Sequence, residues 1–229
     1  MKRFYKAVSV SPDNAVLLDG KPIKTPARNG LMLPTSALAE AVADEWRAQV
    51  SDIDTHAMPL TRLANTAIDQ IATLRAEVIE QTLEYGHSDL LCYRAEDPMA
   101  LTARQQHEWR PLLDWAAERF GLKLQTAIGI MHITQPPESF TSARAFLDSQ
   151  SDFALAAAHS ATSLLGSLVL ALALLDGRLD AEAAFRLSRV DEEFQAEQWG
   201  RDAEADLRAD AHARELGAIA RFLTLSKAR

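Results

Sequence analysis

The chain has 229 residues, of which 48% are hydrophobic and 24% are charged, a composition that supports a sizeable buried core and argues against global disorder. Its 24 basic and 32 acidic side chains give a net charge of -8, which argues against a nucleic-acid-binding protein, because such proteins neutralise phosphates with clustered Lys and Arg. The single cysteine, Cys92, excludes an intramolecular disulfide framework and favours a reducing compartment.

The first ten residues do not read as a targeting signal, although Lys2 and Arg3 carry charge. The stretch from Phe4 to Val10 alternates and is interrupted by Lys6, whereas a secretory signal needs an uninterrupted apolar run. An organelle presequence would be longer and amphipathic. The alternation instead predicts a half-buried β-strand, so we expect the chain to begin directly with structure.

Turn signals divide the following residues into short strands. Asp19-Gly20 favours a two-residue hairpin between a strand at 15–18 and one at 21–25. The prolines around Ile23-Lys24 place that second strand at an edge of the sheet. Asn29-Gly30 is another hairpin signal, and it precedes a possible strand at 31–33.

A helix should follow this small antiparallel sheet. Pro34-Thr35-Ser36 provides its N-cap, and Leu38, Val42 and Trp46 recur at helical spacing, so these three side chains should pack on the sheet. A layer of about fifty residues is small for an independent core and should rely on its neighbour.

Beyond His56 the apolar periodicity is almost entirely helical. Residues 122–133 alternate loosely and should form a strand or an extended link. Helices are expected over residues 58–71, 74–85, 101–120, 139–150, 154–175, 181–199 and 203–225. The sequence therefore predicts an α+β protein, with a small antiparallel β-rich N-terminal domain over 1–54 and a larger α-helical bundle over 55–229.

One apolar stretch, Phe153–Leu175, has no formally charged residue and is long enough to span a bilayer. Its first half is small and polar, and its strongly apolar second half, Leu164–Leu175, is only about a dozen residues long. A helix that is apolar on every side belongs in the middle of a bundle, so we expect a buried helix and no integral membrane span.

The motifs of common catalytic, nucleotide and metal sites are missing from the sequence. There is no Gly-x-Gly-x-x-Gly turn, no phosphate-binding Gly-Lys-Ser or Gly-Lys-Thr and no Gly-x-Ser-x-Gly elbow. The six histidines never pair at the spacing of metal ligands on a helix, and Cys92 lies in an apolar setting typical of an inert buried thiol. We therefore assign no catalytic residue, no metal ligand and no cofactor.

Carboxylates concentrate near the carboxy-terminal end. Residues 191–210 carry eight acidic and two basic side chains, whereas residues 1–30 carry six basic and two acidic ones. Glu193 and Glu197 share a helix face, and Trp199-Gly200 interrupts the acidic run with a large aromatic side chain at an expected helix break. Such a run is a solvated stripe, an acid/base site or a binding surface. Since aromatic residues beside charges are typical of recognition surfaces, binding is the favoured interpretation.

Several blocks occur together, in order, through nearly the whole chain. They are Arg3–Lys6, Leu18–Pro26, Leu33–Thr35, Glu45–Gln49, Met58–Thr61, Asp89–Arg94, Trp109–Trp115, Asp191–Gln195 and Trp199-Gly200. The set resembles the assembly chaperones for the catalytic head of the F-type ATP synthase, specifically the family that binds the α subunit. The resemblance implies a small β-containing N-terminal domain and an orthogonal helical bundle.

The resemblance also implies a function. A member of this family would hold the unassembled α subunit, shield its subunit interface and yield it when the β subunit arrives, so the protein would be a chaperone and not an enzyme. The family's acidic position in its carboxy-terminal helical motif maps onto Asp191, Glu192 and Glu193. We expect Glu193 first and Glu192 second to bind the partner, with Asp191, Glu197 and Trp199 on the same surface.

The resemblance further implies a monomer when the protein is free of its client. Known members occur in mitochondria and in related bacteria. Because the chain opens on its first strand, we expect a bacterial cytoplasm, or the mitochondrial matrix if the source is eukaryotic.

Two other functions remain open. One is a small hydrolase-like enzyme that uses Glu192 or Glu193 as general acid or base, which a deep pocket with a carboxylate of strongly raised pKa would support. The other is a membrane-associated assembly factor anchored by Phe153–Leu175. Trp46, Trp109 and Trp115 lie on apolar helical stripes and are interpreted as core residues, not as binding anchors.

Overall fold

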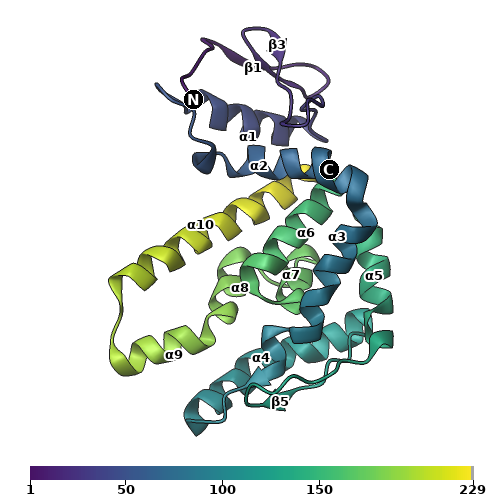
Figure 1. Ribbon diagram of the computed structural model, residues 1–229, viewed down its shortest axis with the longest axis vertical. Coiled ribbons are helices and arrows are strands. Elements are labelled where there is room, and N and C mark those ends of the chain that lie inside the picture. Colours follow the sequence, from purple (N-terminus) through teal and green to yellow (C-terminus); the bar gives the residue numbers. More distant parts are fainter. Residues whose placement is uncertain (228–229) are drawn as a thin grey trace. The chain divides into compact units, whose positions relative to one another are not determined.

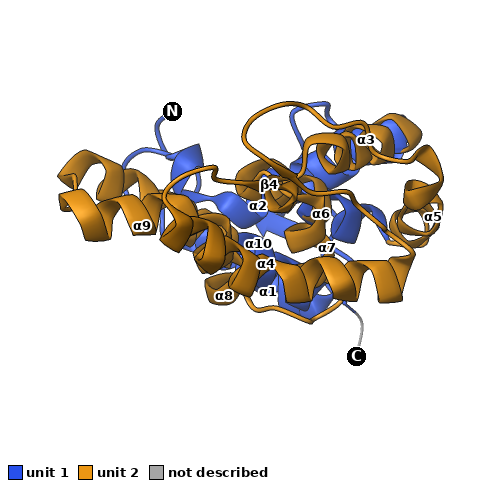
Figure 2. Ribbon diagram, turned by 90° about the horizontal axis from the view of Figure 1, so that it is seen from below, with its two compact units in different colours: residues 1–75, 151–157, 218–229 blue, residues 76–150, 158–217 orange. Residues whose placement is uncertain are grey.

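The computed structural model describes residues 1–227 and divides into two compact units. Unit 1 comprises residues 1–75, residues 151–157 and the carboxy-terminal residues from 218 onward, and unit 2 comprises residues 76–150 and 158–217 (Figure 2). Each unit buries a set of apolar side chains of its own. The division of the sequence into domains at residue 54 stays a prediction.

Unit 1 begins with a three-stranded antiparallel sheet in the order β1-β2-β3 (Figure 1). The strands are β1 (Val8–Val10), β2 (Val16–Leu18) and β3 (Lys21–Pro22). Asp19 and Gly20 have φ angles of 49° and 79° between β2 and β3, as expected for an Asp-Gly hairpin turn. The antiparallel sheet and the edge position of β3 are therefore confirmed.

The strand predicted at residues 31–33 is wrong. This segment contributes only isolated bridges, which pair Met32 with Ala15 and Gly30 with Lys24. The preceding loop is held instead by the Asp69 carboxylate, which accepts hydrogen bonds from Thr25 Oγ1, Ala27 N and Asn29 Nδ2. That contact spans about forty residues of chain, so the local Asn-Gly signal does not reveal it.

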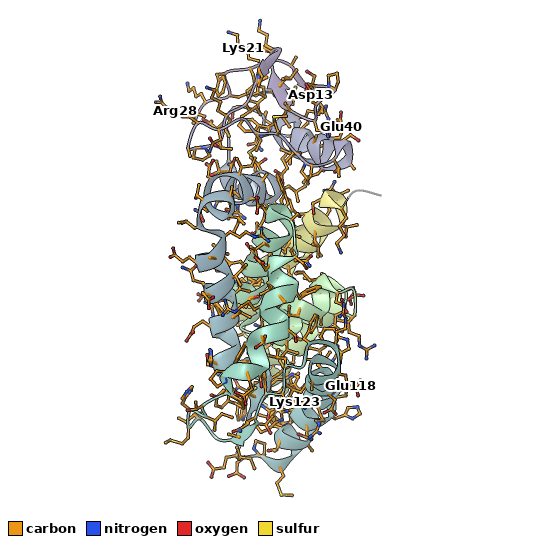
Figure 3. The ribbon with its side chains drawn as sticks, turned by 90° about the vertical axis from the view of Figure 1, so that its right-hand side faces the viewer. Asp13, Lys21, Arg28, Glu40, Glu118 and Lys123 are labelled. Carbon is orange, nitrogen blue, oxygen red and sulfur yellow. The ribbon has the colours of Figure 1, made fainter. Side chains whose placement is uncertain are left out.

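Helix α1 (Ser36–Arg47) covers the sheet as predicted (Figure 1). The Thr35 hydroxyl caps α1 by accepting a hydrogen bond from Leu38 N at 3.1 Å. Leu38 and Val42 are fully buried, whereas Trp46 is half-buried against the cluster of Tyr5, Leu18, Ile53 and Met58. Basic residues of the amino-terminal part, among them Lys21 and Arg28, extend into solvent (Figure 3).

The rest of the chain is predominantly helical. Unit 1 also contains α2 (Pro59–Thr66), and the chain passes between the units within α3 (Ala72–Glu84), α6 (Asp152–Leu165) and α10 (Ala203–Ser226). The elements confined to unit 2 are β4 (Tyr93–Arg94), α4 (Met99–Phe120), β5 (Ala127–Ile128), α5 (Thr141–Asp148), α7 (Leu168–Leu175), α8 (Ala181–Ser188) and α9 (Val190–Trp199). The predicted α+β fold with a small antiparallel sheet followed by helices is confirmed.

A single helix over residues 154–175 is wrong, because the chain breaks between α6 and α7. Gly166 has a φ of 63°, and the Ser167 hydroxyl caps α7 by accepting a hydrogen bond from Leu170 N at 3.1 Å. All eight residues of α7 are buried, so the most apolar part of the stretch lies in the interior of unit 2. Within residues 1–227, no helix combines the length and the hydropathy that crossing a bilayer requires.

A single helix over residues 181–199 is also wrong, because α8 and α9 meet at Arg189, whose φ and ψ are -121° and 24°. Trp109 is 1% exposed and donates its indole N–H to the Leu187 carbonyl at 2.8 Å. A continuous helix would use that carbonyl for the amide of residue 191. The core interpretation of Trp109 is confirmed, and its hydrogen bond accompanies the helix break.

Candidate functional site

The five predicted partner-binding residues all lie on α9. Asp191, Glu192 and Glu193 occupy the first turn, where the helix dipole favours negative charge. Glu197 lies one turn after Glu193, and Trp199 is the last residue of the helix. Val190 is the only residue of α9 that is buried, so most of this helix is accessible to a partner. We call these five residues the α9 surface.

Two of the carboxylates connect α9 to α4. Gln105 Nε2 donates to Asp191 Oδ1 at 2.6 Å, and Arg104 Nη1 lies 2.8 Å from both carboxylate oxygens of Glu197. The helices α4 and α9 pack against each other, so these polar contacts orient α9 within unit 2. The Arg104–Glu197 ion pair is partly exposed, and exposed ion pairs contribute little to stability, whereas Gln105 is buried.

The other two carboxylates have different partners. Arg201 Nη2 donates to Glu193 Oε2 at 2.8 Å, and Arg201 Nη1 bonds Asp206 at 3.0 Å. Glu192 lies 3.5 Å from Arg189 Nη1. The structure therefore brings Asp191 and Glu197 onto α4 but directs Glu193 and Glu192 to other cations, so the four acids do not form one unpaired cluster.

Trp199 is the aromatic residue of the α9 surface. Its exposed fraction is 80%, and Gly200, with a φ of 91°, ends α9 immediately after it. A large aromatic side chain left in water is unfavourable in an isolated protein and is typical of an interaction surface. Trp115 contrasts with it, because Trp115 is half-buried and packs edge-to-face on Phe120 at 5.4 Å.

Glu192 also lines a cavity of about 450 Å³ within unit 2. Arg189 lines the same cavity, together with Ser88, Ser163, Ser188 and His212. These polar side chains share the cavity with Glu192 and would be available to an acid/base reaction there. Among residues 1–227, no three His, Cys, Asp or Glu side chains are grouped in a way that would hold a metal ion.

Asp89 is a fully buried carboxylate, and its contacts are structural. Asp89 Oδ1 accepts hydrogen bonds from Leu91 N and Ser167 Oγ, and Oδ2 accepts one from Val169 N at 3.0 Å. Burial raises the pKa of Asp89 to about 6, although these hydrogen bonds lower it. Asp89 thus fixes the start of α7. Burial also raises the pKa of the nearby Cys92 thiol, as expected for an inert cysteine.

The basic and amide side chains that partner the α9 surface are not among the residues predicted from the sequence. Arg189 and Glu192 are three residues apart, a spacing that signals a helical ion pair. Arg104 and Glu197 are 93 residues apart in sequence, and only the packing of α4 on α9 brings them together. No local signal reveals that second pair.

Comparison with known proteins adds three findings. A family model described as "ATP12 chaperone protein" matches residues 2–117. The mitochondrial protein atp12 of Schizosaccharomyces pombe is 27% identical over 215 residues, which cover 87% of this chain and 74% of that protein. The crystal structure of Atp12 from Paracoccus denitrificans has a TM-score of 0.89, and that of the D202K mutant of P. denitrificans Atp12p has a TM-score of 0.91. Both are 43% identical to this chain, and each comparison covers 99% of this chain and 98% of the other.

Proposed function

Because the chain belongs to the ATP12 chaperone family, we propose that it assists assembly of the catalytic head of the F-type ATP synthase and that its client is the unassembled α subunit. In this proposal the chaperone covers the subunit interface of α. The β subunit then displaces the chaperone as the head assembles.

The observation that carries the proposal is the exposure of α9. This helix buries only Val190, carries four carboxylates and ends in Trp199, which is 80% exposed. A large aromatic side chain supplies contact area at low conformational cost, and the acidic groups attract a basic client surface. The α9 surface therefore has the anchor and the charge that a transient protein–protein contact needs.

The proposed release step follows from interface energetics. A free subunit exposes apolar contacts and strand edges that favour aggregation, and a chaperone suppresses aggregation by occupying them. A small contact patch gives modest affinity, whereas a permanent subunit interface is larger and more apolar. Docking of β thus displaces the chaperone by competition, and the mechanism requires no nucleotide and no cofactor.

The proposal assigns no catalytic role to Glu192 or Glu193. Each carboxylate faces an arginine, at 3.5 Å for Glu192 and 2.8 Å for Glu193, which suits a charged recognition surface.

We also propose that the free protein is a monomer. A bacterial cytoplasm is favoured as its compartment, because identity with the Paracoccus protein is 43% and with the fungal mitochondrial protein 27%. For a eukaryotic source the compartment would be the mitochondrial matrix.

Co-expression tests the proposed client. The tagged chain is produced with isolated α subunit, with isolated β subunit or with the preassembled head, and the retained protein is measured. We expect retention of α alone. Retention of β alone, or of none of the three, contradicts the proposal.

A charge reversal tests the proposed surface. Glu193→Lys should reduce retention of α and impair head assembly while the circular dichroism spectrum stays unchanged. Glu118→Lys is the matched control, because Glu118 is an exposed acid of α4 (Figure 3) outside the α9 surface. If retention in the Glu193→Lys variant equals that in the control, Glu193 does not belong to the site.

A further inference from the structure

Arg94 is a buried cation whose hydrogen-bonding capacity is not filled. The residue is 5% exposed, and its guanidinium lies 5.1 Å from the ring centroid of Trp109. Arg94 Nη1 donates to the Leu91 carbonyl, and Nε makes a long contact of 3.4 Å to Gln106 Oε1. Arg94 Nη2 is buried and has no acceptor anywhere in residues 1–227.

An orphaned donor on a buried cation is energetically unfavourable. Removing a guanidinium from water has a desolvation cost that hydrogen bonds or an opposite charge normally offset. Neither kind of contact reaches Nη2 of Arg94. Asp191 and Arg110 act on Arg94 electrostatically with opposite signs, and no carboxylate in the described part of the chain forms an ion pair with it. The missing interaction is that of an anionic acceptor.

Arg94 lines an open groove of about 690 Å³ between the first turns of α4 and strand β5. The groove walls include Met99 and Gln106 of α4 and Ile128 of β5. Met99 is 80% exposed and Ile128 is 67% exposed, so the rim presents apolar surface to solvent. The one acidic side chain of the lining is Glu96, which is exposed at the rim. We call this site the Arg94 groove.

We propose that the Arg94 groove is a second client contact, which binds an aspartate or glutamate side chain flanked by apolar residues. The carboxylate accepts a hydrogen bond from Arg94 Nη2, and its apolar neighbours contact Met99 and Ile128. Gln106 rotates away from its weak contact with Arg94 Nε to admit the carboxylate, and Met99 adapts because its thioether side chain is flexible.

The chemistry of the groove selects this occupant. A buried guanidinium recognises carboxylate oxygens through charge-assisted hydrogen bonds, and apolar walls favour a carboxylate carried between apolar side chains over a free anion. The groove also lies near helix α9, since α4 contributes Met99 and Gln106 to the groove and Arg104 to the contact with α9. The identification of the occupant as a client segment rests on the proposed chaperone function.

A peptide titration tests the groove without the client. The probes are acetyl-Leu-Glu-Leu-amide and its glutamine counterpart, acetyl-Leu-Gln-Leu-amide. The readout is the NMR spectrum of the full chain labelled with ¹³C at its methionine methyl groups, because Met99 and Met131 report on unit 2 and the buried Met58 of unit 1 is an internal reference. We expect a saturable shift of the Met99 signal, with the glutamate peptide binding about tenfold more tightly than the glutamine peptide.

Variants assign that preference to Arg94. Arg94→Gln should remove the difference between the two peptides, whereas Arg119→Gln, which removes an exposed arginine from the last turn of α4, should preserve it. Ile128→Asp places a carboxylate on the exposed wall and should abolish binding of the glutamate peptide, so the test does not depend on the folding of Arg94→Gln.

Two results would overturn the proposal: no shift of Met99 with the glutamate peptide, or equal affinity of the wild-type protein for both peptides. If the wild-type protein fails to retain the α subunit, the proposed function is contradicted. The peptide titration would still show whether the Arg94 groove binds a carboxylate.

Discussion

Helices α7 and α9 have similar lengths but nearly opposite surroundings. All eight residues of α7 are buried and none is charged, whereas α9 buries Val190 alone and carries four carboxylates. Apolar burial stabilises α7 in the core of unit 2, whereas α9 packs on α4 and makes polar contacts with it through Glu197 and Asp191. The difference shows that folding constrains the sequence of α7 far more than that of α9, which leaves α9 available for recognition.

The largest expected effect comes from a truncation in α7. Leu172 is 1% exposed, so Leu172→Ala removes buried methyl groups and leaves a cavity. We expect the free energy of unfolding to fall by about 2–5 kcal/mol. Urea denaturation followed by circular dichroism measures the loss.

Leu207→Ala is the control for this truncation, because Leu207 is 69% exposed on α10. Its effect should stay within about 0.5 kcal/mol. Equal losses for the two variants would contradict the contrast between buried and exposed helices.

The second effect is a pH dependence at the start of α7. Burial raises the pKa of Asp89 from 3.8 to about 6, so the folded protein retains this proton over a range in which the unfolded chain has lost it. The contribution of Asp89 to stability therefore falls as the pH rises from about 4 to about 6, by about 3 kcal/mol in total.

Asp89→Asn has no carboxyl group to titrate and isolates this effect. The free energy of unfolding of the wild-type protein minus that of the variant should fall between pH 4 and pH 6 and then become constant. A difference that does not change with pH would show that the Asp89 carboxyl does not titrate in that range.

The third effect concerns the other helix and separates binding from stability. If the proposed function holds and Trp199 contacts the client, Trp199→Ala should weaken retention of the α subunit about tenfold, because truncating an aromatic side chain in an interface removes binding free energy. The same variant should change the free energy of unfolding by no more than about 0.5 kcal/mol. The measurements are a binding titration and urea denaturation, and a large loss of stability would place Trp199 with the core residues.

Local signals in the sequence predicted the elements whose ends are set by nearby residues. The Thr35 cap of α1 and the Asp19-Gly20 turn depend on residues within a few positions of them. Gly121, with a φ of 64° at the end of α4, is likewise a local terminator. These elements appear where the sequence predicts them.

The break between α6 and α7 has a local signal in Gly166-Ser167, and distant contacts accompany the breaks in both long helices. Asp89 bonds Ser167 and Val169 across about eighty residues of chain, and Trp109 bonds the Leu187 carbonyl across 78 residues. Helical periodicity continues through both breaks, so the sequence predicts one helix where tertiary hydrogen bonds favour two.

The same limit applies to the candidate site. The acidic run and Trp199 are visible in the sequence, and their role in binding the client stays a prediction. The unfilled donor of Arg94 is not visible, because Arg94 belongs to a short apolar block and its solvent exclusion arises from packing around β4 and α4. Charge patterning therefore suggests an exposed surface, whereas a buried and unpaired cation requires coordinates.

The smallest expected effect is the coupling between Arg104 and Glu197. This ion pair joins α4 to α9 with both contacts at 2.8 Å, and its two side chains are 34% and 54% exposed. Solvent screens such a pair, so a double-mutant cycle with Arg104→Gln and Glu197→Gln should give a coupling free energy of about 0.2–1 kcal/mol, decreasing as salt is added. A weak coupling means that α9 can adjust on α4 when a client binds. A coupling above about 2 kcal/mol would instead mean that the ion pair fixes α9 nearly as firmly as apolar packing fixes α7. The two helices would then differ in the type of contact that holds them and not in the strength of their attachment.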